Sequence, residues 1–267
     1  VTTSFWTGFP RQFWTGDYPF IDYADIHHYG REGEVRPLGY VYEPSDFFDA
    51  AAFSQKLSMA HGAISPNGAN MPLLRGETGF VFENDDPFSW NEADGLWLHN
   101  LTWAGINAGG MTELYWTGAP TGRHIAGDSH NHFGVYRTFA TFMADVPLAN
   151  GQYRPANAES SEATLRAWGQ KDVQNGRFHL WLQNRDHTWQ NVLNGAPISP
   201  VDAEVTLTGF APNEAVQLVW WETRSGTVLR EETVAVDAEG VIRFEVTGLM
   251  SDVAVQGYGV GSDAPVV

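Results

Sequence analysis

The sequence predicts an α/β region followed by an all-β region. Up to about residue 156, short apolar strands alternate with amphipathic helices, a pattern typical of a parallel sheet with helical crossovers. Beyond that residue, strand follows strand with Gly, Asn and Asp at the turns, which indicates an antiparallel sandwich. The change falls on a polar connector, residues 150–157, which carries Gly and Pro. We therefore predict two domains, residues 1–156 and residues 157–267.

The first region contains four predicted strands and three predicted helices. They are predicted from the pattern of apolar residues along the chain. We expect strands at Val1–Phe5, Ile21–Tyr29, Pro72–Phe80 and Met111–Trp116, and helices from about Ser45 to His61, Glu92 to Ala108 and His132 to Ala144.

The second region contains seven predicted strands. Apolar alternation at residues 178–182 and the turn pairs Asn175-Gly176 and Glu239-Gly240 favour an antiparallel arrangement. The strands are expected near Thr164–Trp168, Phe178–Asn184, Ala203–Thr208, Ala215–Glu222, Val228–Val236, Val241–Val246 and Val253–Gly257.

The excess of acidic over basic residues limits which classes of ligand the protein is expected to bind. Lys and Arg total 15 against 32 Asp and Glu, so the formal net charge is -17. A field of this sign repels nucleic acids and anionic membranes, and it favours a neutral or cationic ligand. The chain has no cysteine, which excludes thiol nucleophiles and cysteine-based zinc sites. No apolar run approaches the roughly 20 residues that span a bilayer, so no membrane span is expected.

Unusual side chains gather at the ends of three predicted strands. The first of these strands ends in His27-His28-Tyr29, the second carries Arg75-Gly76-Glu77, and the third ends at Trp116. In this order and spacing they resemble the sixth, seventh and eighth strands of cellulase-like retaining glycoside hydrolases. In that family the sixth strand ends in His-x-Tyr, the seventh in a nucleophilic Glu, and the eighth in a Trp below the reacting sugar.

The resemblance implies the C-terminal half of a (β/α)8 barrel, strands five to eight, followed by a β-sandwich. Val1–Phe5 is then strand five. It also implies that Glu77 is the nucleophile and that His27, Tyr29, Trp116 and Arg75 bind substrate. Active sites of such barrels lie at the C-terminal ends of the strands, where these residues are predicted. Alternation along a strand is expected to place Arg75 and Glu77 on one face.

A nucleophilic carboxylate must stay ionised, and hydrogen bonds from Tyr29, His27 or Arg75 would lower its pKa. A second carboxyl group ~5 to 5.5 Å away must protonate the leaving oxygen and then activate water. The structural alternatives are a solvated loop carboxylate at Glu77, a core histidine at His27, and a core tryptophan at Trp116. His28, one residue out of phase, is expected to point away from the barrel interior.

The proton donor is not expected in this chain. Asn91-Glu92 reproduces the Asn-Glu pair that carries the acid/base in this family, but it follows strand seven instead of ending strand four. Ser89 and Glu92 fit a capping box that opens the next helix, and we favour that interpretation. The N-terminal barrel half is therefore expected as an upstream segment or a second polypeptide, because a half barrel leaves unpaired sheet edges.

Two other clusters are less informative. Glu83, Asp85 and Asp86 could bind a hard cation, but a solvated acidic loop is the favoured interpretation. His124, His130 and His132 could line the substrate cleft, and their irregular spacing is not that of a metal site. Four tryptophans of the second region could form a glycan platform, although alternation assigns at least half of them to the core. They are Trp181, Trp189, Trp220 and Trp221.

Together these patterns predict a retaining O-glycosyl hydrolase that acts on a β-linked polysaccharide or oligosaccharide without a cofactor. The alternative is a non-catalytic surface or carbohydrate-binding protein that keeps a barrel scaffold. A secreted or cell-surface location is expected, because polysaccharides are met outside the cell.

Overall fold

The computed structural model describes residues 20–30, 49–55, 73–81, 95–107, 112–118 and 133–259. By contacts the chain divides into two compact units. The first unit is Val1–Val135 with Thr188–Leu193, and the second is Tyr136–His187 with Asn194–Val267. The domain boundary at residue 156 stays a prediction.

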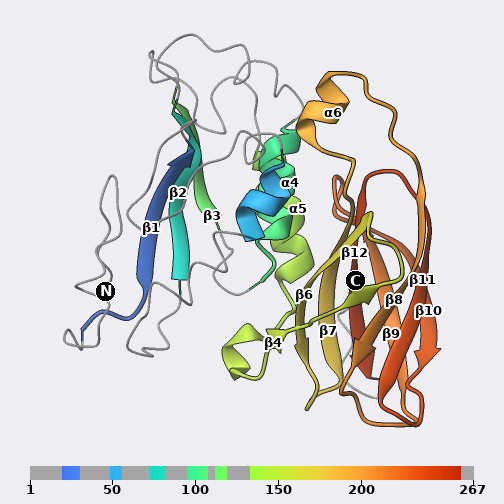
Figure 1. The fold of residues 1–267 in the computed structure, drawn as a ribbon. Coiled ribbons are helices and arrows are strands. Elements are labelled where there is room, and N and C mark those ends of the chain that lie inside the picture. The colour runs from blue at the N-terminus through green and yellow to red at the C-terminus, as the bar shows by residue number, and fades with distance from the viewer. Residues whose placement is uncertain are drawn as a thin grey trace. The chain divides into compact units, whose positions relative to one another are not determined.

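The described strands of the first unit form a parallel three-stranded sheet (Figure 1). Its strands are β1 (Ala24–Gly30), β2 (Leu73–Val81) and β3 (Thr112–Gly118), and β2 lies between the other two. All three were expected from the sequence, and sequential parallel neighbours are what strand–helix–strand units produce. The strand predicted at Val1–Phe5 lies outside the described residues.

Two helical segments accompany this sheet. Residues 50–55 are helical, within the predicted helix 45–61, and Asp49 caps their start by accepting the Ala52 N–H at 3.1 Å. Helix α4 (Leu96–Ala104) is buried on every face, including its polar residues His99, Asn100 and Thr102. The Ser54 hydroxyl joins the two segments by donating to the Leu101 carbonyl at 2.9 Å.

The predicted start of α4 was wrong. The helix begins at Leu96, and its N-cap is Gly95 in the left-handed region with φ 63°. Glycine adopts this positive φ readily because it has no Cβ. The proposed capping box at Ser89 and Glu92 lies outside the described part of the chain.

The second unit is built from two antiparallel sheets that share one core. Their inner faces contribute residues such as Leu180, Val205, Leu218, Ile242 and Val255, all buried. The strand orders are β10-β9-β12-β7-β6-β4 and β11-β8-β5. The bounds are β4 (Arg154–Pro155), β5 (Glu159–Ser160), β6 (Leu165–Asp172), β7 (Arg177–Asn184), β8 (Val201–Thr208), β9 (Ala215–Glu222), β10 (Thr227–Ala235), β11 (Val241–Leu249) and β12 (Asp252–Gly259).

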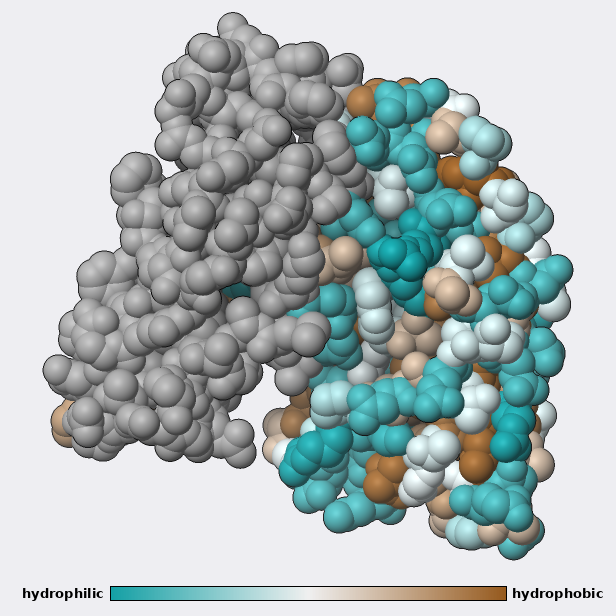
Figure 2. Space-filling view, viewed as in Figure 1, coloured by the Kyte–Doolittle hydropathy of each residue, from teal (hydrophilic) through white to brown (hydrophobic). Residues whose placement is uncertain are grey.

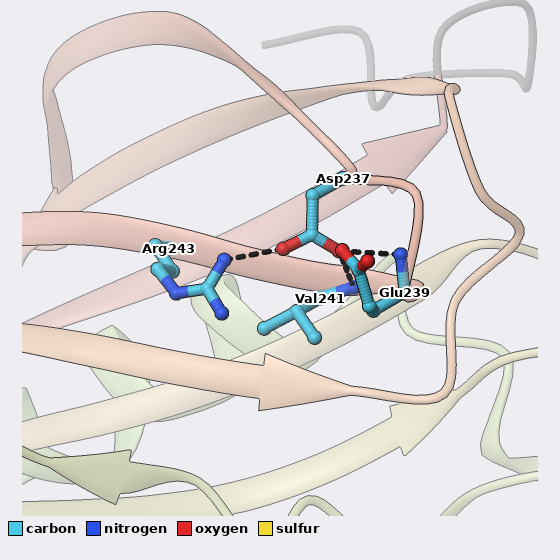
Figure 3. A network of polar contacts seen from close by, with 4 residues as sticks. All are labelled: Asp237, Glu239, Val241 and Arg243. Atoms are coloured by element: carbon cyan, nitrogen blue, oxygen red, sulfur yellow. Dashed lines mark hydrogen bonds and ion pairs between the residues drawn. The ribbon is translucent and has the colours of Figure 1, made fainter.

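The turn that links β10 to β11 is held by one carboxylate. Asp237 accepts the N–H groups of Glu239 and Val241 at 3.0 and 2.9 Å, and it also accepts from Arg243 (Figure 3). Gly240 completes the turn with φ 77°. The predicted turn pair at Glu239-Gly240 is therefore confirmed at the point where the chain reverses.

Helix α5 (Phe133–Met143) was also expected from the sequence. Within the second unit, its Phe142 ring meets Trp221 edge to face at 5.9 Å between centroids. The Gln256 amide on β12 donates to the Phe142 carbonyl at 2.6 Å. These contacts fix the later part of α5 to the outer face of the six-stranded sheet.

Four short elements were not predicted from the sequence. They are the two-residue strands β4 and β5, the helix α6 (Trp189–Leu193), and the 3-10 turn η2 (Leu148–Asn150). The Thr188 hydroxyl oxygen accepts the Asn191 N–H at 3.2 Å and so caps α6.

Candidate active site

The register of the parallel sheet aligns the predicted site residues in two rows. His27 on β1 is the partner of Glu77 on β2, and Glu77 is the partner of Leu114 on β3. Closer to the strand ends, Tyr29, Gly79 and Trp116 form the second row. The first row lies near the middle of the three strands, and the second row lies two residues closer to their C-terminal ends. The C-terminal ends are the edge where parallel strands of an α/β fold present a site.

The pairing of β1 with β2 changes register just before the first row. Ala24 and Asp25 pair with Leu73 and Leu74, whereas His27 pairs with Glu77. One extra residue of β2 is therefore accommodated, as in a β-bulge. Had the first register continued, His28 and not His27 would be the partner of Glu77, so the shift decides which histidine aligns with the predicted nucleophile.

Arg75 lies within this irregular stretch, so strict alternation does not fix its relation to Glu77. Its side chain is buried, with 1% of its surface exposed, and Nη2 donates to the Ser54 hydroxyl at 2.8 Å. Burial lowers the pKa of Arg75 from 12.5 to about 9, so the guanidinium stays charged at neutral pH. Arg75 therefore links β2 to the helical segment 50–55.

Gly76 separates Arg75 from Glu77 and lies in the stretch of β2 where the pairing with β1 changes register. Its N–H donates to the Asp25 Oδ1 at 3.0 Å. A Cβ at position 76 would collide with this carboxylate and lie 2.9 Å from its Cγ. Only glycine therefore lets Asp25 approach the backbone at this point, and sequence analysis did not identify Asp25.

All residues of the remaining predicted clusters lie outside the described residues. These are Glu83, Asp85, Asp86, Asn91, Glu92, His124, His130 and His132. Within the described part of the chain, no group of three or more His, Asp or Glu residues has the arrangement of a metal site. No described helix is long and apolar enough to cross a membrane.

The suggested glycan platform in the second region was wrong. Trp181, Trp189, Trp220 and Trp221 are each at most 7% exposed. Trp181 and Trp220 also donate their indole N–H groups to Asp252 and Glu232, both at 2.7 Å. Figure 2 shows hydrophobic and hydrophilic residues interspersed over the visible face of the described part. The four rings are core residues, and their stacking surface is not available to a sugar.

Comparison with known proteins shows a likeness in fold. No protein-family model and no curated protein matches the chain. One solved glycoside hydrolase aligns with a TM-score of 0.53 and 13% identity, over 94% of this chain and 55% of that chain. A family 5 glycoside hydrolase from Bacteroides vulgatus aligns with a TM-score of 0.55 and 14% identity, over 94% of this chain and 53% of that chain.

The chain thus spans about half the length of the solved structures it matches. At such low identity the likeness concerns the fold and not the chemistry. The parallel sheet followed by an antiparallel sandwich is therefore similar in fold to part of these glycoside hydrolases.

Proposed function

We propose that this chain is part of a retaining O-glycosyl hydrolase acting on a β-linked polysaccharide or oligosaccharide, with Glu77 as the nucleophile. The observation that carries the proposal is the alignment of His27, Glu77 and Leu114 across three adjacent parallel strands. Glu77 lies four residues before the C-terminal end of β2, and barrel enzymes bind substrate at the C-terminal ends of their strands. The likeness in fold to solved glycoside hydrolases supports the same conclusion.

In the proposed reaction, a Glu77 oxygen attacks the anomeric carbon while the bond to the leaving oxygen breaks. A second carboxylic acid gives its proton to that oxygen, and a glycosyl-enzyme ester remains. The same carboxylate then takes a proton from water, which attacks the anomeric carbon and releases Glu77. The sugar keeps its configuration because the carbon is inverted twice.

The other predicted site residues take supporting roles in this proposal. His27 and Tyr29 lie on β1 in register with Glu77 and Gly79. From there they would donate hydrogen bonds that keep Glu77 ionised. Trp116 ends the second row, where an indole face suits a sugar ring. Arg75 is buried and donates to Ser54, so it would support substrate binding indirectly, by holding the β2 backbone that leads to Glu77.

The acid/base residue and the rest of the barrel are proposed to come from an upstream segment or a second polypeptide. The support is that the chain covers about half of each matching glycoside hydrolase. A closed barrel also removes the free edges of an open parallel sheet. Because polysaccharides are extracellular, a secreted or cell-surface location is proposed for the whole protein.

The test compares Glu77→Gln with Glu92→Gln in the full-length protein, using aryl β-glycosides and soluble β-glucans, xylans and mannans. Glu77→Gln is expected to lower kcat/KM by roughly three orders of magnitude or more, because the amide cannot act as a nucleophile. Glu92→Gln, the matched control, is expected to retain activity. Activity that survives Glu77→Gln would remove Glu77 from the mechanism.

The alternative function predicts a different result. A non-catalytic carbohydrate-binding protein would bind one of these polymers in titration calorimetry and hydrolyse none of them. Loss of all activity in Glu92→Gln would instead identify Glu92 as the proton donor and place the acid/base in this chain.

A further inference from the structure

At the register shift between β1 and β2, a buried backbone amide takes a side-chain acceptor. Gly76 is buried and lies in the stretch of β2 where the pairing with β1 changes register. An unsatisfied buried N–H is costly, so native proteins give it an acceptor. Here the acceptor is the Asp25 carboxylate, and Asp25 is also the last residue paired before the register changes.

The residue that precedes this amide is held as well. Arg75 is tied to Ser54, and Ser54 is tied in turn to the Leu101 carbonyl on α4. The Asp25 carboxylate lies so close to Gly76 that no side chain fits between them. The two residues that precede Glu77 are therefore both held in place. Ser54 holds Arg75, and Asp25 on β1 holds Gly76.

We propose that Asp25 is a positioning residue: its bond to the Gly76 N–H holds the bulge and so sets His27, instead of His28, in register with Glu77. Without that bond, β2 can return to the register that Ala24 and Leu73 begin. Because the side-chain period of a strand is two, a slip by one residue would turn Glu77 relative to its neighbours. The catalytic part of this inference rests on the proposed function, whereas the structural part does not.

The structural part is tested at the Gly76 amide itself. Arg75-Gly76 is the only Arg-Gly pair in the sequence, so protein with carbonyl-labelled Arg and nitrogen-labelled Gly gives one NMR signal, from Gly76. Asp25→Ala is expected to shift this signal and to speed its hydrogen exchange roughly tenfold or more, as loss of a charge-assisted bond implies. Asp25→Asn keeps an acceptor oxygen and is expected to restore most of the protection.

A matched control uses the same kind of bond in the second unit. Asp202 accepts the Gly248 N–H at 2.6 Å, so Asp202→Ala removes a carboxylate–glycine bond without touching β1 or β2. The Gly76 signal is expected to be unchanged in this variant. A Gly76 signal that is also unchanged in Asp25→Ala would overturn the proposal.

The catalytic part is tested by kinetics of the full-length protein. Asp25→Ala is expected to lower kcat about tenfold or more with little change in KM, Asp25→Asn to recover most of the loss, and Asp202→Ala to have no effect. The effect of His27→Gln should shrink in the Asp25→Ala background, because His27 is then out of register with Glu77.

Additive effects of Asp25→Ala and His27→Gln would contradict the positioning role. If the wild-type protein hydrolyses no glycoside, the proposed function fails, and the Gly76 signal still decides whether Asp25 holds the bulge.

Discussion

Gly76→Ala adds one methyl group at the bulge and so tests how closely Asp25 packs against the β2 backbone. A Cβ at position 76 would lie 2.9 Å from the Asp25 Cγ and 3.0 Å from Oδ2. The carboxylate must retreat by at least about 0.5 Å to reach an ordinary van der Waals separation, and its bond to the Gly76 N–H is then lost. Overpacking costs about 1–3 kcal/mol and the lost bond about 1.5–3 kcal/mol, so we expect a total of about 2.5–6 kcal/mol.

The assay is urea unfolding of the full-length protein, with Asp25→Ala and the double variant beside it. Since Asp25→Ala removes the group that collides, Gly76→Ala should cost about 1–3 kcal/mol less in that background. Gly134→Ala is the matched control, because a Cβ at this position in α5 meets nothing within 4 Å. It should stabilise the helix by about 0.5–1 kcal/mol. The reasoning is refuted if Gly76→Ala is as stable as the wild type, or if its cost is independent of Asp25.

Three further predictions concern the second unit. Asp252→Ala leaves the buried Trp181 N–H without its 2.7 Å acceptor and should cost about 1–3 kcal/mol in urea unfolding, with most of the loss recovered by Asp252→Asn. Burial raises the pKa of Tyr153 to about 12, so its contribution to stability is complete below pH 10 and is lost as the pH rises towards 12. Ultraviolet titration of Tyr153→Phe should therefore lack one late-ionising phenol. The bond from Arg243 and the Val241 N–H lower the pKa of Asp237, so its contribution is present above the ordinary value of 3.8 and is lost as the pH falls below it. The difference in Tm between wild type and Asp237→Asn should then shrink in acid, and an unchanged difference would contradict the assigned cause.

The sandwich could be predicted well because its strands alternate between the core and solvent. Val201–Thr208 shows this most clearly, since its buried positions recur at every second residue. Very short elements leave too few residues for such a pattern. Arg154–Pro155 is one example, and Trp189–Leu193 is another, although Thr188 before it is a usable capping signal.

The start of α4 was misjudged for a different reason. All nine of its residues are buried, the polar His99, Asn100 and Thr102 among them, so a change from exposed to buried positions marks no boundary. The start near Glu92 was expected from a Ser-x-x-Glu pattern that lies outside the described residues. The start depends on a positive φ at Gly95, which the helical pattern does not contain.

At the candidate site, the sequence identified the strands that carry His27, Glu77 and Trp116, because each ends in side chains that are unusual for a strand. It did not reveal which residues are in register. That depends on the shift at Gly76, for which glycine inside an apolar strand was the available signal. Asp25 carries no signal of its own, because its role depends on an amide far away in the sequence.

Covalent trapping tests the identity of the nucleophile most directly. The full-length protein would be treated with fluorinated aryl β-glycosides of glucose, xylose and mannose, which slow release of a glycosyl-enzyme. Digestion and tandem mass spectrometry would then locate the attached sugar. We expect one sugar per protein, attached at Glu77 and absent from Glu77→Gln. A sugar attached to another carboxylate, or turnover of the reagent with no attachment, would contradict the assignment.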